Sequence, residues 1–150
     1  MTHVFSPHTY ELYIRSTAEQ VWRAIVDPDL TQKYYFGGRV ESRWQIEAPY
    51  HYVGPDGEID IEGHVLEIEP HKRLVTTFKP KWFPQPTQEP SKLTWTIEDL
   101  QTFSLLTLTH EHIDDESFSE GQFHRGWLYV LSGLKSVLET GEGLPDLPGA

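Results

Sequence analysis

The stretch GWLYVLSGLKSVLETG, residues 126–141, constrains this fold more than any other part of the sequence. Counted from Phe123, the large apolar residues recur at intervals of four, four, three and four, which traces one line along an α-helix. These residues are Phe123, Trp127, Leu131, Leu134 and Leu138. With Ser117 and Glu120 at capping-box spacing, the pattern predicts a helix of about five to six turns that starts after DDES. A face this apolar must lie against solid core, another protein or a cavity.

Two glycines, Gly126 and Gly133, lie on one flank of this stripe. A glycine has no side chain, so a neighbouring backbone can approach the helix closely there. We therefore expect close packing against both positions.

Two short helices are predicted near the start of the chain. Ser16 with Glu19 and Thr17 with Gln20 both have capping-box spacing, and an apolar stripe follows until Pro28 closes the helix. A second short helix is expected through residues 29–36, ending at the pair of glycines that follows.

The remaining segments predict strands. Residues 9–15 alternate between apolar and polar side chains, as do 39–46, 58–70, 73–79, 92–98 and 103–112. Trp44, Phe78, Trp95 and Phe103 fall in these predicted strands, and Gly63 indicates a bulge or bend. Because the helices are segregated from the strands, the expected fold class is α+β, with an antiparallel sheet covered by helices on one face.

The charge and composition exclude several classes of function. Acidic residues outnumber basic ones 23 to 12, for a net charge of -11, without a basic cluster, so we expect no nucleic-acid partner and no adsorption to anionic lipid. The absence of cysteine excludes disulfides and thiolate chemistry. No apolar run predicts membrane insertion or a signal peptide, so we expect a cytoplasmic protein with one domain, 5–141, and a flexible tail, 142–150.

Four segments resemble a known family: VWRAIVDPD, GHVLEIEPHKRLVTTF, LTWTIED with LLTLTHE, and the C-terminal helix itself. In this order, over residues 10–141, they are similar to the family named for the activator of the heat-shock-protein 90 ATPase. That family belongs to the START-like (SRPBCC, Bet v 1-like) helix-grip superfamily. The resemblance implies a curved antiparallel sheet wrapped around the long helix, with a cavity that binds apolar or amphipathic molecules. Where relatives commonly carry a tryptophan, this chain has KYYF, which places Tyr34 and Tyr35 at the expected cavity edge.

The cavity is expected under the first turns of the terminal helix, because a helix on a strongly curved sheet stands off at one end. Small hydrophobic or aromatic molecules are the expected partners, and no cofactor is expected. The candidate ligand-binding residues are Trp22, Tyr34, Trp44, His64, Phe78, Trp95, His110, Phe123, Trp127 and Leu131. Rings would desolvate the ligand, whereas His64, His110, Tyr34 or an indole N–H would orient it. Ordinary core packing is the competing interpretation for each ring.

Catalysis is the alternative function. His110 with Glu62 or Asp60 would form an acid–base pair for a cofactor-free cyclase, dehydratase or hydrolase. Two imidazoles, His110 and His112, would share a strand face, but a metal site would need a third ligand such as His64, and we expect none. The sequence favours binding over catalysis.

A third alternative is a protein-interaction or chaperone-associated module. The proline-rich loop from Pro80 to Pro90 carries two rings, Trp82 and Phe83. Rings in such a loop form a lid over the cavity, a contact in a homodimer, or packing against the sheet edge.

Overall fold

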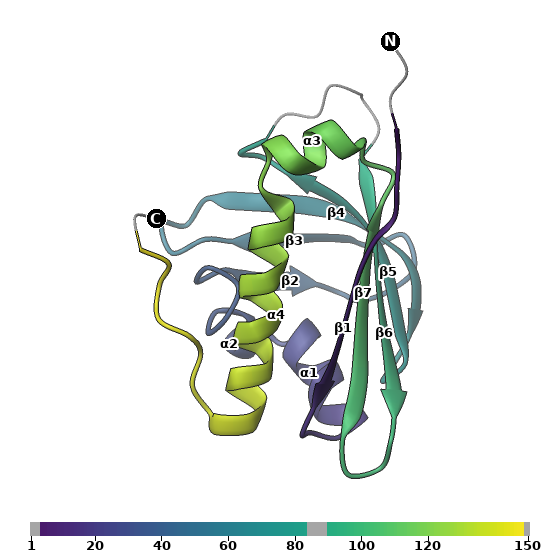
Figure 1. Ribbon diagram of the computed structural model, residues 1–150, viewed down its shortest axis with the longest axis vertical. Coiled ribbons are helices and arrows are strands. Elements are labelled where there is room, and N and C mark those ends of the chain that lie inside the picture. The colour runs from purple at the N-terminus through teal and green to yellow at the C-terminus, as the bar shows by residue number, and fades with distance from the viewer. Residues whose placement is uncertain (1–3, 84–89, 149–150) are drawn as a thin grey trace.

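A seven-stranded antiparallel sheet curves around one long helix in the computed structural model, which describes residues 4–83 and 90–148 (Figure 1). The strands are β1 (His8–Ile14), β2 (Arg39–Ser42), β3 (Pro49–Val53), β4 (Ile59–Glu69), β5 (Arg73–Pro80), β6 (Ser91–Asp99) and β7 (Ser104–Glu111), in the sheet order β1-β7-β6-β5-β4-β3-β2. The helices are α1 (Ala18–Val26), α2 (Pro28–Thr31), α3 (Asp115–Glu120) and α4 (Phe123–Thr140). The predicted α+β helix-grip fold is confirmed.

Helix α1 begins as the sequence predicts. Thr17 is its N-cap, and Thr17 and Gln20 form the reciprocal capping box. The buried side of α1, which includes Val21 and Trp22, faces the interior of the sheet. Pro28 does close α1, but it also occupies the first turn of α2, where its missing N–H costs nothing.

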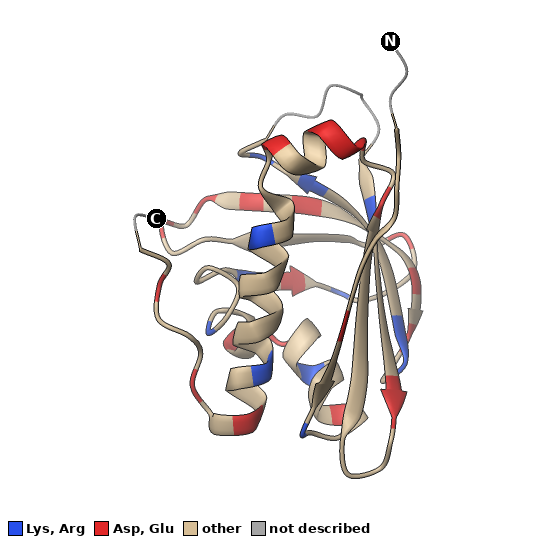
Figure 2. Cartoon of the chain, in the orientation of Figure 1, with Lys and Arg blue, Asp and Glu red and all other residues tan. Residues whose placement is uncertain are grey.

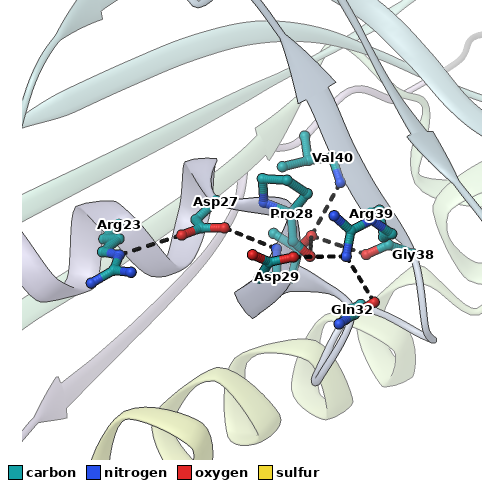
Figure 3. A network of polar contacts seen from close by, with 9 residues as sticks. Arg23, Asp27, Pro28, Asp29, Gln32, Gly38, Arg39 and Val40 are labelled. Atoms are coloured by element: carbon teal, nitrogen blue, oxygen red, sulfur yellow. Dashed lines mark hydrogen bonds and ion pairs between the residues drawn. The ribbon is translucent and has the colours of Figure 1, made fainter.

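Helix α2 is shorter than predicted: it ends at Thr31, whereas the sequence predicted an end near residue 36. After Leu30 the backbone changes to i→i+3 bonds, from Lys33 N to Leu30 O and from Tyr34 N to Thr31 O. The buried Thr31 hydroxyl donates to Gly38 O (2.9 Å) and accepts from the backbone N–H of Val40 (3.1 Å), which ties α2 to β2 (Figure 3). These bonds fix the loop that carries Tyr34 and Tyr35.

The strand predictions need three corrections. Trp44 lies beyond the end of β2 with a φ of 51°, and Phe103 lies in the turn before β7, so neither is in a strand. His112 follows the end of β7 with a φ of 64° and is exposed, so it does not share a strand face with His110. Strand β3 has no counterpart among the predicted segments, although its burial alternates, with Tyr50 and Tyr52 pointing inward.

Gly63 allows the sheet to bend, although the register shift itself lies between Val65 and Glu67. A Cβ at Gly63 would overlap the carbonyl oxygen of Thr77 and lie 2.7 Å from the Tyr50 ring. The Tyr50 hydroxyl donates to that same Thr77 oxygen at 2.6 Å. The tyrosine ring therefore crosses the space that a side chain at residue 63 would fill.

The predicted terminal helix is two helices. Asp114, not Ser117, is the N-cap of α3, and its carboxylate accepts from Ser117 N at 3.1 Å. Gln122 then adopts a left-handed φ of 54°, which breaks the helical path before α4 begins at Phe123. Helix α4 has 18 residues, and the apolar stripe runs along it: Phe123, Trp127, Leu131 and Leu134 are all buried against the sheet.

The chain after α4 turns back beside the helix (Figure 1). Gly141 closes α4 in the left-handed conformation, with a φ of 88°. The Tyr129 hydroxyl donates to Pro145 O at 2.8 Å, and the Ser136 hydroxyl donates to Glu142 O at 2.7 Å. The flexibility expected for 142–150 remains a prediction, but residues 142–148 lie close enough to α4 to form part of its surroundings.

Candidate ligand pocket

A pocket of about 410 Å³ lies beside the N-terminal half of α4. Its lining residues are Tyr35, Phe36, Ile61, Phe78, Trp82, Gly121, Gln122, Phe123, Arg125, Gly126, Trp127, Val130, Leu147 and Pro148. They come from the loop after α2, from β4 and β5, from the segment after β5, from the turn between α3 and α4, from α4 and from the C-terminal tail. The volume is within the range of small-molecule sites.

Six of the fourteen lining residues are aromatic. The Phe123 ring lies 5.3 Å from the ring of Trp82 and 6.2 Å from that of Phe78, measured between centroids. Phe78 in turn lies 5.6 Å from Trp127, and Tyr35 meets Trp127 edge-on at 6.3 Å. Such edge-to-face and tilted contacts hold the rings against one another and leave their remaining faces for a ligand.

Gly126 is the open position in this wall. A Cβ built there meets no atom within 4 Å, whereas a Cβ at Gly133, two turns further along α4, would lie 3.0 Å from the Cβ of Tyr34. The expected close packing is therefore found at Gly133 and not at Gly126. Gly126 faces the pocket, and a side chain placed there would enter it.

His110 is buried beside the pocket and is fully hydrogen-bonded. The Trp127 indole N–H donates to His110 Nδ1 at 3.1 Å, so the proton of the neutral ring lies on Nε2. His110 Nε2 donates to the Ser91 hydroxyl at 2.8 Å, and that hydroxyl donates to Phe78 O at 3.1 Å. Burial, with a smaller contribution from His8, lowers the pKa of His110 to about 3. The imidazole is therefore neutral near pH 7, and both of its nitrogens are engaged.

The structure does not bring His110 together with the predicted carboxylates. Ile61, Gly63 and Val65 of β4 point inward, and Glu62 and His64 alternate with them on the outer face. Glu62 lies 3.5 Å from Lys81 Nζ in a partly exposed ion pair. Among residues 4–83 and 90–148, no group of three potential ligands could hold a metal ion.

The other candidates divide between core and surface. Phe78, Phe123 and Trp127 line the pocket. Trp22, Trp95, Tyr34 and Leu131 are buried in the core, outside its lining. The Tyr34 hydroxyl donates to Ala24 O at 2.7 Å, so it does not face a ligand. Trp44 is half-buried near the end of β2, where it stacks on Tyr50.

Sequence reasoning missed the tail, Arg125 and the opening at Gly126. The signal for the tail was its two Leu-Pro pairs, Leu144 with Pro145 and Leu147 with Pro148. Arg125 falls off the apolar stripe, and no pattern marks a polar helix position as part of a pocket.

A second, larger hollow lies at the other end of α4, between Tyr13, Phe103 and Lys135. Its walls include charged residues, and Lys135 is already bonded to Glu139 (2.8 Å) and to Tyr13 O (2.6 Å). This hollow is therefore a less favourable binding site for an apolar ligand than the aromatic pocket.

The sheet, the long helix and the pocket between them define a helix-grip domain. The chain belongs to the family of activator of Hsp90 ATPase homolog 1-like proteins, whose model matches residues 15–139. No curated protein sequence matches it. Within the described part of the chain, no helix is long and apolar enough to cross a membrane.

Three solved structures illustrate the similarity of fold. DynU16, from the dynemicin biosynthetic locus, is 21% identical with a TM-score of 0.74, and the match covers 91% of this chain and 48% of that one. Protein MLL2253 from Mesorhizobium loti is 20% identical (TM-score 0.75; 95% and 100% covered). The Aha1 dimer from Colwellia psychrerythraea is 14% identical (TM-score 0.75; 92% and 99% covered). The chain thus spans about half of DynU16 and nearly all of the other two.

Proposed function

We propose that this protein binds a small, largely apolar molecule in the pocket beside α4. The observation that carries the proposal is the 410 Å³ volume walled by six aromatic residues. A ligand that buries about 300 Å² of apolar surface there gains roughly 7 kcal/mol from desolvation. The loss of translational and rotational freedom on association offsets part of this gain, so an affinity in the high micromolar to millimolar range is expected.

The alternatives have weaker support. DynU16 comes from a biosynthetic locus and the Aha1 structure is a dimer, but at identities under 25% neither property transfers directly to this chain. A cofactor-free enzyme would need a base other than His110, whose ring nitrogens are both occupied. A homodimer contact through Trp82, which is 56% exposed, remains a prediction.

The test is a titration with the neutral fluorescent probe N-phenyl-1-naphthylamine. We expect saturable binding to the wild-type protein. Gly126→Phe places a ring in the pocket and is expected to weaken binding at least tenfold, since the added ring and the probe compete for one space. Leu128→Phe adds the same ring at a position of α4 that is 47% exposed and lies outside the pocket, so it serves as the matched control.

Two results would count against the proposal. The first is the absence of saturable binding to the wild-type protein. The second is equal affinity in Gly126→Phe and Leu128→Phe, with both variants melting cooperatively by circular dichroism.

A further inference from the structure

The ionisable groups of the pocket wall are hydrogen-bond donors, and the amide of Gln122 adds one group that can both donate and accept. Arg125 is the one charged residue in the lining, among the residues that the structure describes, and Tyr35 is the other ionisable group. Among residues 4–83 and 90–148, the lining includes no carboxylate, although acidic residues outnumber basic ones by 23 to 12 in the whole chain. The pocket wall therefore carries a positive charge, whereas the protein as a whole is negatively charged.

Arg125 is available to a ligand. Its side chain is exposed, and it has no ion-pair partner within residues 4–83 and 90–148, unlike Arg39, for example, which pairs with Asp29 (2.9 Å). The first turn of α4 also contains no acidic residue, and its N-cap makes no side-chain hydrogen bond. The charge of Arg125 is thus not neutralised locally. Figure 2 shows the basic positions scattered singly among acidic ones.

Tyr35 provides a second donor. Its residue is 6% exposed, and its ring stacks on that of Tyr52 at 4.2 Å. The hydroxyls of Tyr34 and Tyr50 bond to backbone carbonyls, but that of Tyr35 has no hydrogen-bond partner in the described part of the chain. Burial raises the pKa of Tyr35 well above its ordinary value, so the hydroxyl keeps its proton. Tyr35 lines the pocket and its hydroxyl oxygen is not among the fully buried polar atoms, so the hydroxyl is free to donate to a ligand.

Two electrostatic effects oppose each other at this pocket. The net charge of -11 repels an anion, but exposed charges are largely screened beyond about 8 Å at physiological ionic strength. Acidic residues next to lining positions are Asp60 and Glu62 on either side of Ile61, Glu120 before Gly121 and Asp146 before Leu147, and none of them lines the pocket itself. A direct contact with Arg125 therefore outweighs the distant repulsion. A cationic guest would meet Arg125 without any carboxylate in the wall to compensate.

We infer that the preferred ligand is a planar aromatic molecule carrying an anionic group such as a carboxylate or sulfonate. Its rings lie among the aromatic side chains, its anionic group contacts the Arg125 guanidinium, and the Tyr35 hydroxyl donates to a ligand oxygen. This inference rests on the proposed function and adds the chemical class of the ligand to it.

The experiment compares two probes with the same aromatic rings. 1-Anilinonaphthalene-8-sulfonate is anionic, and N-phenyl-1-naphthylamine is its neutral counterpart. We expect the sulfonate to bind about two- to fivefold more tightly, as for one exposed ion pair, and added salt to reduce the difference. Arg125→Gln is expected to lower the affinity for the sulfonate more than that for the neutral probe, which removes the preference. Arg43→Gln, which changes the net charge equally at an exposed position outside the pocket, is expected to retain it.

The outcomes separate the two proposals. Failure of the neutral probe to bind overturns the proposed function. Binding of both probes without a preference, or equal effects of Arg125→Gln and Arg43→Gln, overturns this inference and leaves the pocket as a neutral apolar site. Tyr35→Phe keeps the stacked ring, so an unchanged affinity for the sulfonate in that variant overturns the part assigned to the hydroxyl.

Discussion

Acidification is expected to destabilise the protein through His110. The ring is fully buried and neutral, and Nδ1 already accepts the indole N–H of Trp127. A second proton on the ring would remove that acceptor and place a charge where water cannot reach it. Burial is the main reason that the pKa falls to about 3 in the folded protein, and the field of His8 adds to it.

The sign and size of the effect follow from linkage. In the unfolded chain a histidine has a pKa of about 6.5. Because the folded-state pKa is lower, the unfolded chain takes up the proton first as the pH falls below about 6.5. His110 therefore contributes stability that is present above that pH and is lost progressively down to about pH 3. Between pH 7 and pH 5 the expected loss is about 2 kcal/mol.

The assay is urea unfolding followed by tryptophan fluorescence, at pH 7 and pH 5, for the wild-type protein and His110→Gln. Glutamine does not titrate, and its amide offers both a donor and an acceptor to the same neighbours. The other titrating groups are common to both proteins, so they cancel in the comparison. We expect the wild-type protein to lose about 2 kcal/mol more than the variant. Losses that agree within about 0.5 kcal/mol would refute the argument, since His110 would then titrate as it does in the unfolded chain.

Glycine substitutions provide further predictions. Gly126→Ala is expected to raise the free energy of unfolding by about 1 kcal/mol, because alanine favours the helix and the new methyl group meets open space. Gly133→Ala gives the same gain in helix propensity, but its Cβ would press on Tyr34, which is held in place by the hydrogen bond of its hydroxyl. We therefore expect no net increase in stability for Gly133→Ala. Equal increases in the melting temperatures of the Gly126→Ala and Gly133→Ala variants would contradict this. Gly63→Ala is expected to cost at least about 2 kcal/mol in urea unfolding, because its Cβ would overlap the Thr77 carbonyl, and an unchanged midpoint would show that the sheet relaxes easily there.

The sequence was sufficient for the fold because periodicity reports which face of an element is buried. The apolar stripe of α4 and the alternation in β6 and β7 are strong local signals, and the structure confirms the sheet and the long helix that they predict. The break between α3 and α4 was missed because it depends on one left-handed residue, Gln122, and glutamine carries no signal for that conformation.

The candidate site was predicted less completely, because periodicity does not say what covers a buried face. Trp95 and Trp127 look equivalent in sequence, yet Trp127 lines the pocket and Trp95 does not. His110 was considered as a catalytic base, and nothing in THEH shows that Trp127 and Ser91 would occupy both of its nitrogens. Such contacts join residues far apart in the chain, so they appear only once the fold is known.

The hydrogen bond between Trp127 and His110 has a consequence for selectivity. To turn its indole aside for a guest, Trp127 would have to abandon a buried acceptor, at a cost of about 1–3 kcal/mol. Trp82, also in the wall, is 56% exposed and can adjust more freely. The binding surface is thus preorganised at Trp127 and adaptable at Trp82. The pocket would therefore select ligands by how well their shape fits the rigid indole of Trp127, and Trp82 would move to accommodate ligands of different size.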